Sequence, residues 1–325
     1  SKLAGNHISV WTGLAVNLIG YIGTAVIVFL ILSILFENPV ISVLGTMGVM
    51  LTQCMISDAM LVRMYMIYTL FTALLAYSHL RLRRKDGIFN YVILGVSVVG
   101  GFLTQYYFVF FIFGFFVFEM IFNLKEKKYK AIVKYVVTMI ICGVVITLSW
   151  SFWIQAVTSS THSEGILSNA KGFLGHLGKV YYAYELIMAA VFQRAYKAFM
   201  IIIPVLITAF LIVVSFTVAD DAADEKKRLT RQFVVELLCI SVMYAFIVNV
   251  LTPDYLSSTR YYYADMMLVL MLYVITIFGI AREVLDKLRL ELKRTLVYGI
   301  AGFCVIVTNV ILCSTGYGID YYGDA

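Results

Sequence analysis

Long apolar runs recur along the whole chain, and the segments between them are too short to form a soluble domain. A helix needs about 20 apolar residues to cross a bilayer, and a spanning helix satisfies its own backbone hydrogen bonds. The composition agrees, since 62% of the 325 residues are hydrophobic and 14% are charged, whereas soluble domains carry about 25% charged residues. The sequence therefore predicts an all-α fold, a polytopic integral membrane bundle of about ten transmembrane helices.

Polar residues between the apolar runs divide the chain into these spans. The stretch 88–123 is too long for one helix, and we divide it at the polar segment 104–107. We expect a single transmembrane domain over residues 1–325, with 154–196 as an extracytoplasmic loop. A helix from Tyr181 onward in that loop would lie in the membrane interface. The predicted spans are 11–35, 40–57, 62–80, 88–104, 106–123, 132–153, 197–218, 233–252, 262–281 and 295–314.

Basic residues gather in alternate loops, and this alternation predicts the orientation. Most of the 25 lysine and arginine residues lie in the loops near 81–85, 125–134, 226–231 and 282–294. The positive-inside rule places these loops in the cytoplasm, so both chain ends would lie outside. The alternation holds only if 88–123 crosses the membrane twice. We therefore expect a multi-pass protein of the cell membrane.

Three polar clusters fall at the predicted outer turns, where polar groups against the membrane cost free energy. An acidic and a basic residue across one turn can be a structural ion pair. Arginines at helix ends can anchor to lipid phosphates, and tyrosines can form an interfacial aromatic belt. The functional alternative is a site for an anionic lipid-linked group, because the arginine guanidinium suits phosphate. The clusters contain Asp58, Arg63 and Tyr65, then Gln105 and Tyr106, and finally Arg260.

Short segments in order along the chain resemble bacterial membrane glycosyltransferases of the GT-C superfamily, in the branch similar to protein O-mannosyltransferases. The segments are WTGLAVNL at 11–18, RMY at 63–65, LLAY at 74–77 and LTQYY at 103–107, with a looser similarity in TRY at 259–261. The resemblance implies an inverting enzyme that transfers a sugar from a polyprenyl-phosphate carrier to an acceptor outside the cytoplasm. It also implies a bacterial plasma membrane.

In this family, a carboxylate in the first outer loop activates the acceptor. The segment from Ser1 to Gly5 resembles the stretch just before the family's second span. The sequence is therefore expected to be a fragment truncated at both ends, with the catalytic base upstream of Ser1, and the resemblance assigns no base within it. Asp58 is a candidate second carboxylate.

The resemblance also implies roles for residues that would support the reaction. Arg63 and Arg260 would stabilise the charge on the departing lipid phosphate. Tyr65, Gln105 and Tyr106 would line the pocket for the sugar or the head group.

Gln105 departs from the family pattern, in which a histidine usually precedes the aromatic pair. Glutamine neither titrates nor ligates metals as histidine does. We therefore assign no metal ligand. The resemblance itself allows a divalent metal as a cofactor. The expected partners are the lipid-linked sugar donor, membrane lipids and an acceptor that the sequence does not identify. Nucleic acid is not expected.

Two other classes remain as alternatives. A polymerase or ligase of lipid-linked glycans would also use outer arginines, and a longer outer loop rich in arginine and histidine would favour it. A transporter or lipid flippase would be favoured by paired broken helices and by charges within several spans. The acidic residues inside predicted spans are few, and Glu119 and Glu236 are expected near the inner boundary. No nucleotide-binding loop or zinc-protease motif is present in the sequence.

Overall fold

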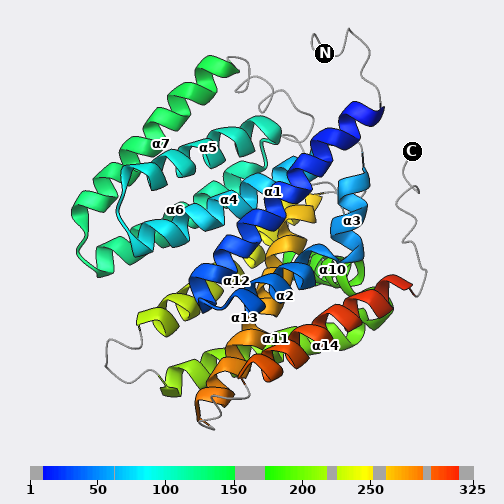
Figure 1. The fold of residues 1–325 in the computed structure, drawn as a ribbon. Helices are drawn as coiled ribbons and strands as arrows, with labels where there is room; N and C mark the ends of the chain where they lie inside the picture. The colour runs from blue at the N-terminus through cyan, green and yellow to red at the C-terminus, as the bar shows by residue number, and fades with distance from the viewer. Residues whose placement is uncertain are drawn as a thin grey trace.

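The structure of this chain is a computed structural model that describes residues 10–61, 63–150, 173–217, 225–251, 261–287 and 294–314 (Figure 1). All regular elements in these residues are helices, so the predicted all-α fold is confirmed. The helices are α1 (Val10–Phe36), α2 (Pro39–Met50), α3 (Gln53–Met60), α4 (Tyr65–Arg84), α5 (Ile88–Thr104), α6 (Phe108–Lys125), α7 (Tyr129–Ser149), α10 (Phe173–Phe192), η2 (Gln193–Ala195), α11 (Tyr196–Thr217), α12 (Glu225–Leu251), α13 (Tyr263–Lys287) and α14 (Arg294–Ser314).

Most of the predicted spans coincide with helices of the structure, and the division of 88–123 is confirmed. Helix α5 ends where the apolar run gives way to polar residues, and the backbone N–H of Gln105 closes its last turn on the carbonyl of Gly101. The N–H of Phe108 then bonds to the carbonyl of Gln105 at the start of α6. The turn is tight because only the residues between Thr104 and Phe108 separate the two helices.

The predicted span 40–57 is not one straight helix. It consists of α2 and α3, whose axes differ by 63°. Helix α2 begins at a complete N-cap, in which the Asn38 side chain accepts from the N–H groups of Val40 and Ile41. The break follows at Thr52, whose backbone is extended and whose hydroxyl donates to the carbonyl of Val49. The polar pair Thr52 and Gln53 marks this break within a largely apolar segment, and hydropathy averaged over the whole span does not show it.

The outer segment predicted at 154–196 contains a helix, as expected. Helix α10 begins at Phe173, before the predicted start at Tyr181, and the 3₁₀ turn at 193–195 joins it to α11. Residues 154–172 lie outside the described residues. The position of α10 in the membrane interface stays a prediction.

Six helical segments of the described residues are long and apolar enough to cross a membrane, or seven if the bent pair of α2 and α3 counts as one span. The chain is therefore a multi-pass membrane protein. Helix α4 carries Arg81, Arg83 and Arg84 in its last turn, and α5 has only 17 residues. The number of ten crossings stays a prediction.

Helix α13 lies at the centre of the bundle. Its apolar window is 83% buried inside the protein, whereas the windows of the other five candidate spans are between 17% and 50% buried. Figure 1 shows α13 between α12, α11 and α2. The outer helices instead expose large apolar side chains, such as Ile140 and Leu148 of α7, which suits lipid contact.

The basic loops lie together at one end of the bundle, which we call the basic end. Arg84, the last residue of α4, pairs with Glu37 after α1, with 3.7 Å between the charged groups. Arg228 at the start of α12 pairs with Glu126 after α6 at the same distance. These loops are far apart in the sequence, so their meeting supports the predicted alternation of the spans. The assignment of this end to the cytoplasm stays a prediction.

Helix α2 packs closely against its neighbours through two glycines. A Cβ atom added at Gly45 would lie 2.6 Å from a methyl carbon of Leu32 and 2.9 Å from one of Val274, and at Gly48 it would lie 2.6 Å from one of Val305. These contacts join α2 to α1, α13 and α14. Small residues allow helices in membranes to approach closely, because packing rather than hydrophobic burial drives their association.

We predict that Gly45→Val lowers the free energy of unfolding by about 1–3 kcal/mol, because it overpacks this interface. Gly143→Val is the matched control, since a Cβ at Gly143 of α7 meets nothing within 4 Å. Both variants place valine in a helix, so the difference between them isolates the steric term. Unfolding in detergent measures it, and equal stabilities would contradict the close packing of α2.

Candidate functional site

The three predicted outer turns come together at the end of the bundle opposite the basic end. The ring of Tyr65, at the start of α4, lies 5.6 Å from that of Tyr263, at the start of α13. The ring of Tyr107, between α5 and α6, lies 5.5 Å from that of Tyr261. We call this region the outer aromatic site, and it comprises Asp58, Arg63, Tyr65, Gln105, Tyr106, Tyr107, Tyr261 and Tyr263.

Asp58 and Arg63 do not form the ion pair that was one interpretation of the first turn. The Asp58 side chain is fully buried, and neither of its oxygens has a hydrogen bond of normal geometry. Thr69 of α4 is near enough to interact with this carboxylate. The Arg63 side chain is exposed and forms no ion pair with any described residue. The two residues therefore have separate roles, since one carboxylate is buried without a cation and one guanidinium faces outward.

The position of Asp58 follows from the turn between α3 and α4. The side-chain amide of Asn17 on α1 donates to the carbonyl of Leu61, and the N–H of Leu61 bonds back to Asp58 and Ser57. Helix α1 therefore holds the end of α3 in place. A buried polar group without a partner is uncommon in native proteins and needs a physical explanation. A ligand that donates a hydrogen bond is one such explanation.

Gln105 and Tyr106 differ in their surroundings. The Gln105 side chain is buried, and its Oε1 atom has no hydrogen-bond partner among the described residues. The ring of Tyr106 is partly buried and stacks on Tyr107, with 4.6 Å between the ring centroids. The second outer turn therefore offers one free acceptor beside an aromatic surface.

Two of the predicted site features fall outside the residues that the structure describes. Arg260 is one of them, and it immediately precedes Tyr261. Ser1 also lies outside the described residues, which begin at Val10. The catalytic base that the resemblance places upstream of Ser1 therefore stays a prediction, and the structure assigns no residue to that role. The carboxylate that it does place in the outer aromatic site is Asp58.

Two hydrogen-bonded tyrosines that the sequence analysis did not identify lie beneath the outer aromatic site. The Tyr68 hydroxyl donates to that of Tyr244 at 3.1 Å, and the Tyr244 hydroxyl donates to the carbonyl of Tyr261 at 2.7 Å. Phe111 stacks on Tyr244 at 4.1 Å. The chain has 23 tyrosines, so residue type alone did not distinguish these two.

Asp265 of α13 is a second buried carboxylate that the sequence analysis missed. It is fully buried and has no hydrogen bond of normal geometry, although it interacts electrostatically with Tyr68 and Tyr244. Its signal in the sequence was an acidic residue just inside an apolar span, which is costly in a membrane.

Charged residues at the basic end form a different arrangement, in which every buried carboxylate has a cation among the described residues. The Arg83 Nη1 atom lies 2.9 Å from an oxygen of Glu236, and its Nε atom lies 3.5 Å from an oxygen of Glu119. The side chains of all three are at most 5% exposed. The Asn123 amide also donates to Glu119 at 2.7 Å, and the guanidinium lies over the Phe122 ring. This cluster joins α4, α6 and α12.

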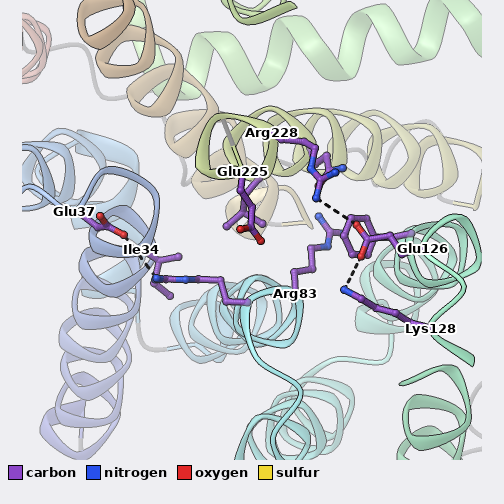
Figure 2. A pocket seen from close by; sticks show the side chains of 11 residues that line it. Ile34, Glu37, Arg83, Glu126, Lys128, Glu225 and Arg228 are labelled. Carbon is purple, nitrogen blue, oxygen red and sulfur yellow. Dashed lines mark ion pairs between the residues drawn. The ribbon is translucent and has the colours of Figure 1, made fainter. Parts of the chain in front are cut away.

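Arg83 also reaches a polar cavity of about 400 Å³, shown in Figure 2. Three further cations line this cavity, and each pairs with a carboxylate: Arg84, Lys128 and Arg228. Lys128 and Arg228 share Glu126, as the dashed lines in the figure show. These cations are already paired with carboxylates. We therefore interpret the cavity as a solvated junction between loops and not as a phosphate-binding site.

His79 of α4 is buried in a structural role. Its Nδ1 atom lies 2.9 Å from the carbonyl of Leu75, and its Nε2 atom lies 2.7 Å from the Tyr135 hydroxyl. Because a carbonyl only accepts, Nδ1 carries the proton and Nε2 accepts from the tyrosine. The ring also stacks on Phe115 at 4.8 Å. Both nitrogens are therefore occupied, and His79 is not free to ligate a metal.

The described residues contain no group of three or more histidine, cysteine, aspartate or glutamate side chains placed to hold a metal ion. Comparison with protein-family models, with curated proteins and with solved structures found no match. The arrangement of the side chains is therefore the basis for a functional proposal.

We predict that Arg83→Leu lowers the free energy of unfolding by about 3–5 kcal/mol, because it leaves two carboxylates buried without a cation. Arg84→Leu, at the neighbouring position, removes a half-exposed pair and costs about 0–1 kcal/mol. Both changes replace arginine with leucine in the last turn of the same helix. Unfolding in detergent compares them, and a loss in Arg84→Leu as large as that in Arg83→Leu would contradict the structural role of Arg83.

Proposed function

We propose that this chain is the membrane part of a glycosyltransferase that binds a polyprenyl-phosphate-linked sugar at the outer face of the bilayer. The observation that carries the proposal is the meeting of the three outer turns in one site. That site combines the exposed guanidinium of Arg63, the buried carboxylate of Asp58 and the unsatisfied amide oxygen of Gln105 with several tyrosine rings.

Each group suits one part of such a substrate. A guanidinium binds phosphate through a planar set of donors, so Arg63 would contact the carrier phosphate. The free oxygens of Gln105 and Asp58 accept hydrogen bonds, which sugar hydroxyls donate. The tyrosine rings offer apolar faces with a polar edge, which suits a sugar ring at the membrane boundary.

The residues of this chain would assist transfer in two ways. As the acceptor oxygen attacks the sugar, the bond to phosphate breaks and the departing lipid phosphate gains negative charge. Arg63 would stabilise that charge through electrostatic interactions that strengthen in the transition state. A carboxylate must take the acceptor proton, and the resemblance assigns no residue among 1–325 to that role. Asp58 would then hold a substrate hydroxyl beside the reacting centre.

A lipid transporter or flippase is a second candidate, and the bend between α2 and α3 favours it. Transporters often bind substrates where a spanning helix is broken, and Asp58 lies on the short outer piece. The buried charges of Arg83, Glu119 and Glu236 also lie inside helices of the bundle. Transporters built from repeats carry paired breaks, however, and the described residues show one bent pair.

Binding of the carrier lipid to the purified chain in nanodiscs tests the proposal. We expect Arg63→Ala to weaken binding of polyprenyl phosphate, with or without an attached hexose, by about tenfold or more, because it removes charge-assisted hydrogen bonds. Gln105→Ala and Asp58→Asn should weaken only the hexose-bearing lipid. Arg84→Ala, an exposed arginine at the basic end, is the control and should bind both lipids normally.

Equal binding by wild type and Arg63→Ala would contradict the proposed site. Movement of a labelled polyprenyl phosphate between the leaflets of vesicles distinguishes the second candidate. Translocation by the wild type that Asp58→Asn abolishes would replace the glycosyltransferase proposal with a transporter.

A further inference from the structure

A groove with apolar walls lies on the side of the bundle, between α10, α11, α12 and α13. It encloses about 490 Å³, and Ile187, Ile207 and Leu238 are among the side chains that line it. Its rim includes Val242, which is more than half exposed. Apolar residues on the outer surface of a membrane bundle face lipid, so a lipid chain can enter this groove from the bilayer. We call it the lateral groove.

One carboxylate belongs to the wall of the lateral groove. Asp265 lines it, is fully buried, and has no hydrogen bond of normal geometry to either carboxylate oxygen. Ser241 of α12 lines the same groove and interacts with this carboxylate. Two buried carboxylate oxygens beside a single serine hydroxyl leave acceptor positions that a ligand in this cavity can fill with a donor.

The charge of the groove restricts what the ligand can carry. None of the residues described as lining it is a lysine, arginine or histidine. A phosphate head group would lie against a carboxylate without a compensating cation, which is unfavourable. An ammonium group would form a buried ion pair, whose desolvation cost often exceeds the attraction. A neutral hydroxyl donates a hydrogen bond and is far less costly to bury.

We propose that the lateral groove binds a membrane lipid with a neutral hydroxyl head group, whose hydroxyl donates a hydrogen bond to Asp265. The lipid chain lies along the apolar walls and continues into the bilayer. The hydroxyl end lies at Asp265, two residues along α13 from Tyr263 of the outer aromatic site. This inference goes beyond the proposed function and does not depend on it, because lipid binding is measured without sugar transfer.

Selectivity of this site rests on the head group and not on the chain. Lipid chains are as apolar as the walls of the groove, so moving a chain from the bilayer into the groove changes its environment little. The hydrogen bond to Asp265 is therefore the main difference between bound and free lipid. Lipids with identical chains and different head groups provide the appropriate probes.

The test is native mass spectrometry of the full chain with dioctanoylglycerol, dioctanoyl phosphatidic acid and dioctanoyl phosphatidylethanolamine. We expect wild type to bind the diacylglycerol about tenfold or more tightly than the other two lipids, as one hydrogen bond to a charged group implies. Asp265→Leu should remove this preference. Asp265→Asn keeps an acceptor oxygen and removes the charge, so it should retain diacylglycerol binding and bind phosphatidic acid more tightly than wild type.

Two variants of α11 control for position. Thr208 lines the groove and is exposed, so Thr208→Trp should fill the groove and weaken binding of all three lipids. Ile201 is 68% exposed and does not line the groove, so Ile201→Trp should bind as wild type does. Tightest binding of phosphatidylethanolamine, or an unchanged diacylglycerol preference in a folded Asp265→Leu, would overturn the proposal.

Discussion

The guanidinium of Arg83 lies between the carboxylates of Glu119 and Glu236 and joins three helices that are distant in the sequence. Each of these charges alone would be very unfavourable inside a membrane bundle. Together they hold the basic ends of α4, α6 and α12 in one arrangement. The loops that follow α1 and α6 then meet around the same cavity, where exposed pairs such as Arg84 with Glu37 add little further stability.

Buried carboxylates at the two ends of the bundle have opposite surroundings. Glu119 and Glu236 share a cation, whereas Asp58 and Asp265 have neither a cation nor a hydrogen bond of normal geometry among the described residues. Paired charges are explained by the structure that they stabilise, whereas buried carboxylates without a cation are not. Asp265 follows Tyr263 of the outer aromatic site by two residues on the central helix α13. A ligand in the lateral groove and one in the outer aromatic site would therefore be neighbours.

The sequence alone determined that the chain is an all-α membrane protein and placed most helix boundaries, including the turn at Gln105. Apolar run length and basic loops carry that information locally, because each helix in lipid must satisfy its own backbone. The outer turns with Asp58, Arg63 and Gln105 were also visible in the sequence. The break at Thr52 was not predicted, because the two polar residues Thr52 and Gln53 are too short an interruption to lower the average hydropathy of the span.

Only the tertiary structure decided which charges are paired. Arg83 looked like one more loop cation, since nothing in its neighbourhood in the sequence distinguishes it from Arg84. The separation of Asp58 from Arg63 and the burial of Asp265 beside a groove likewise depend on helices that are distant in the sequence. Pairing and burial arise from packing between helices, and hydropathy measured along one helix does not record what lies across from it.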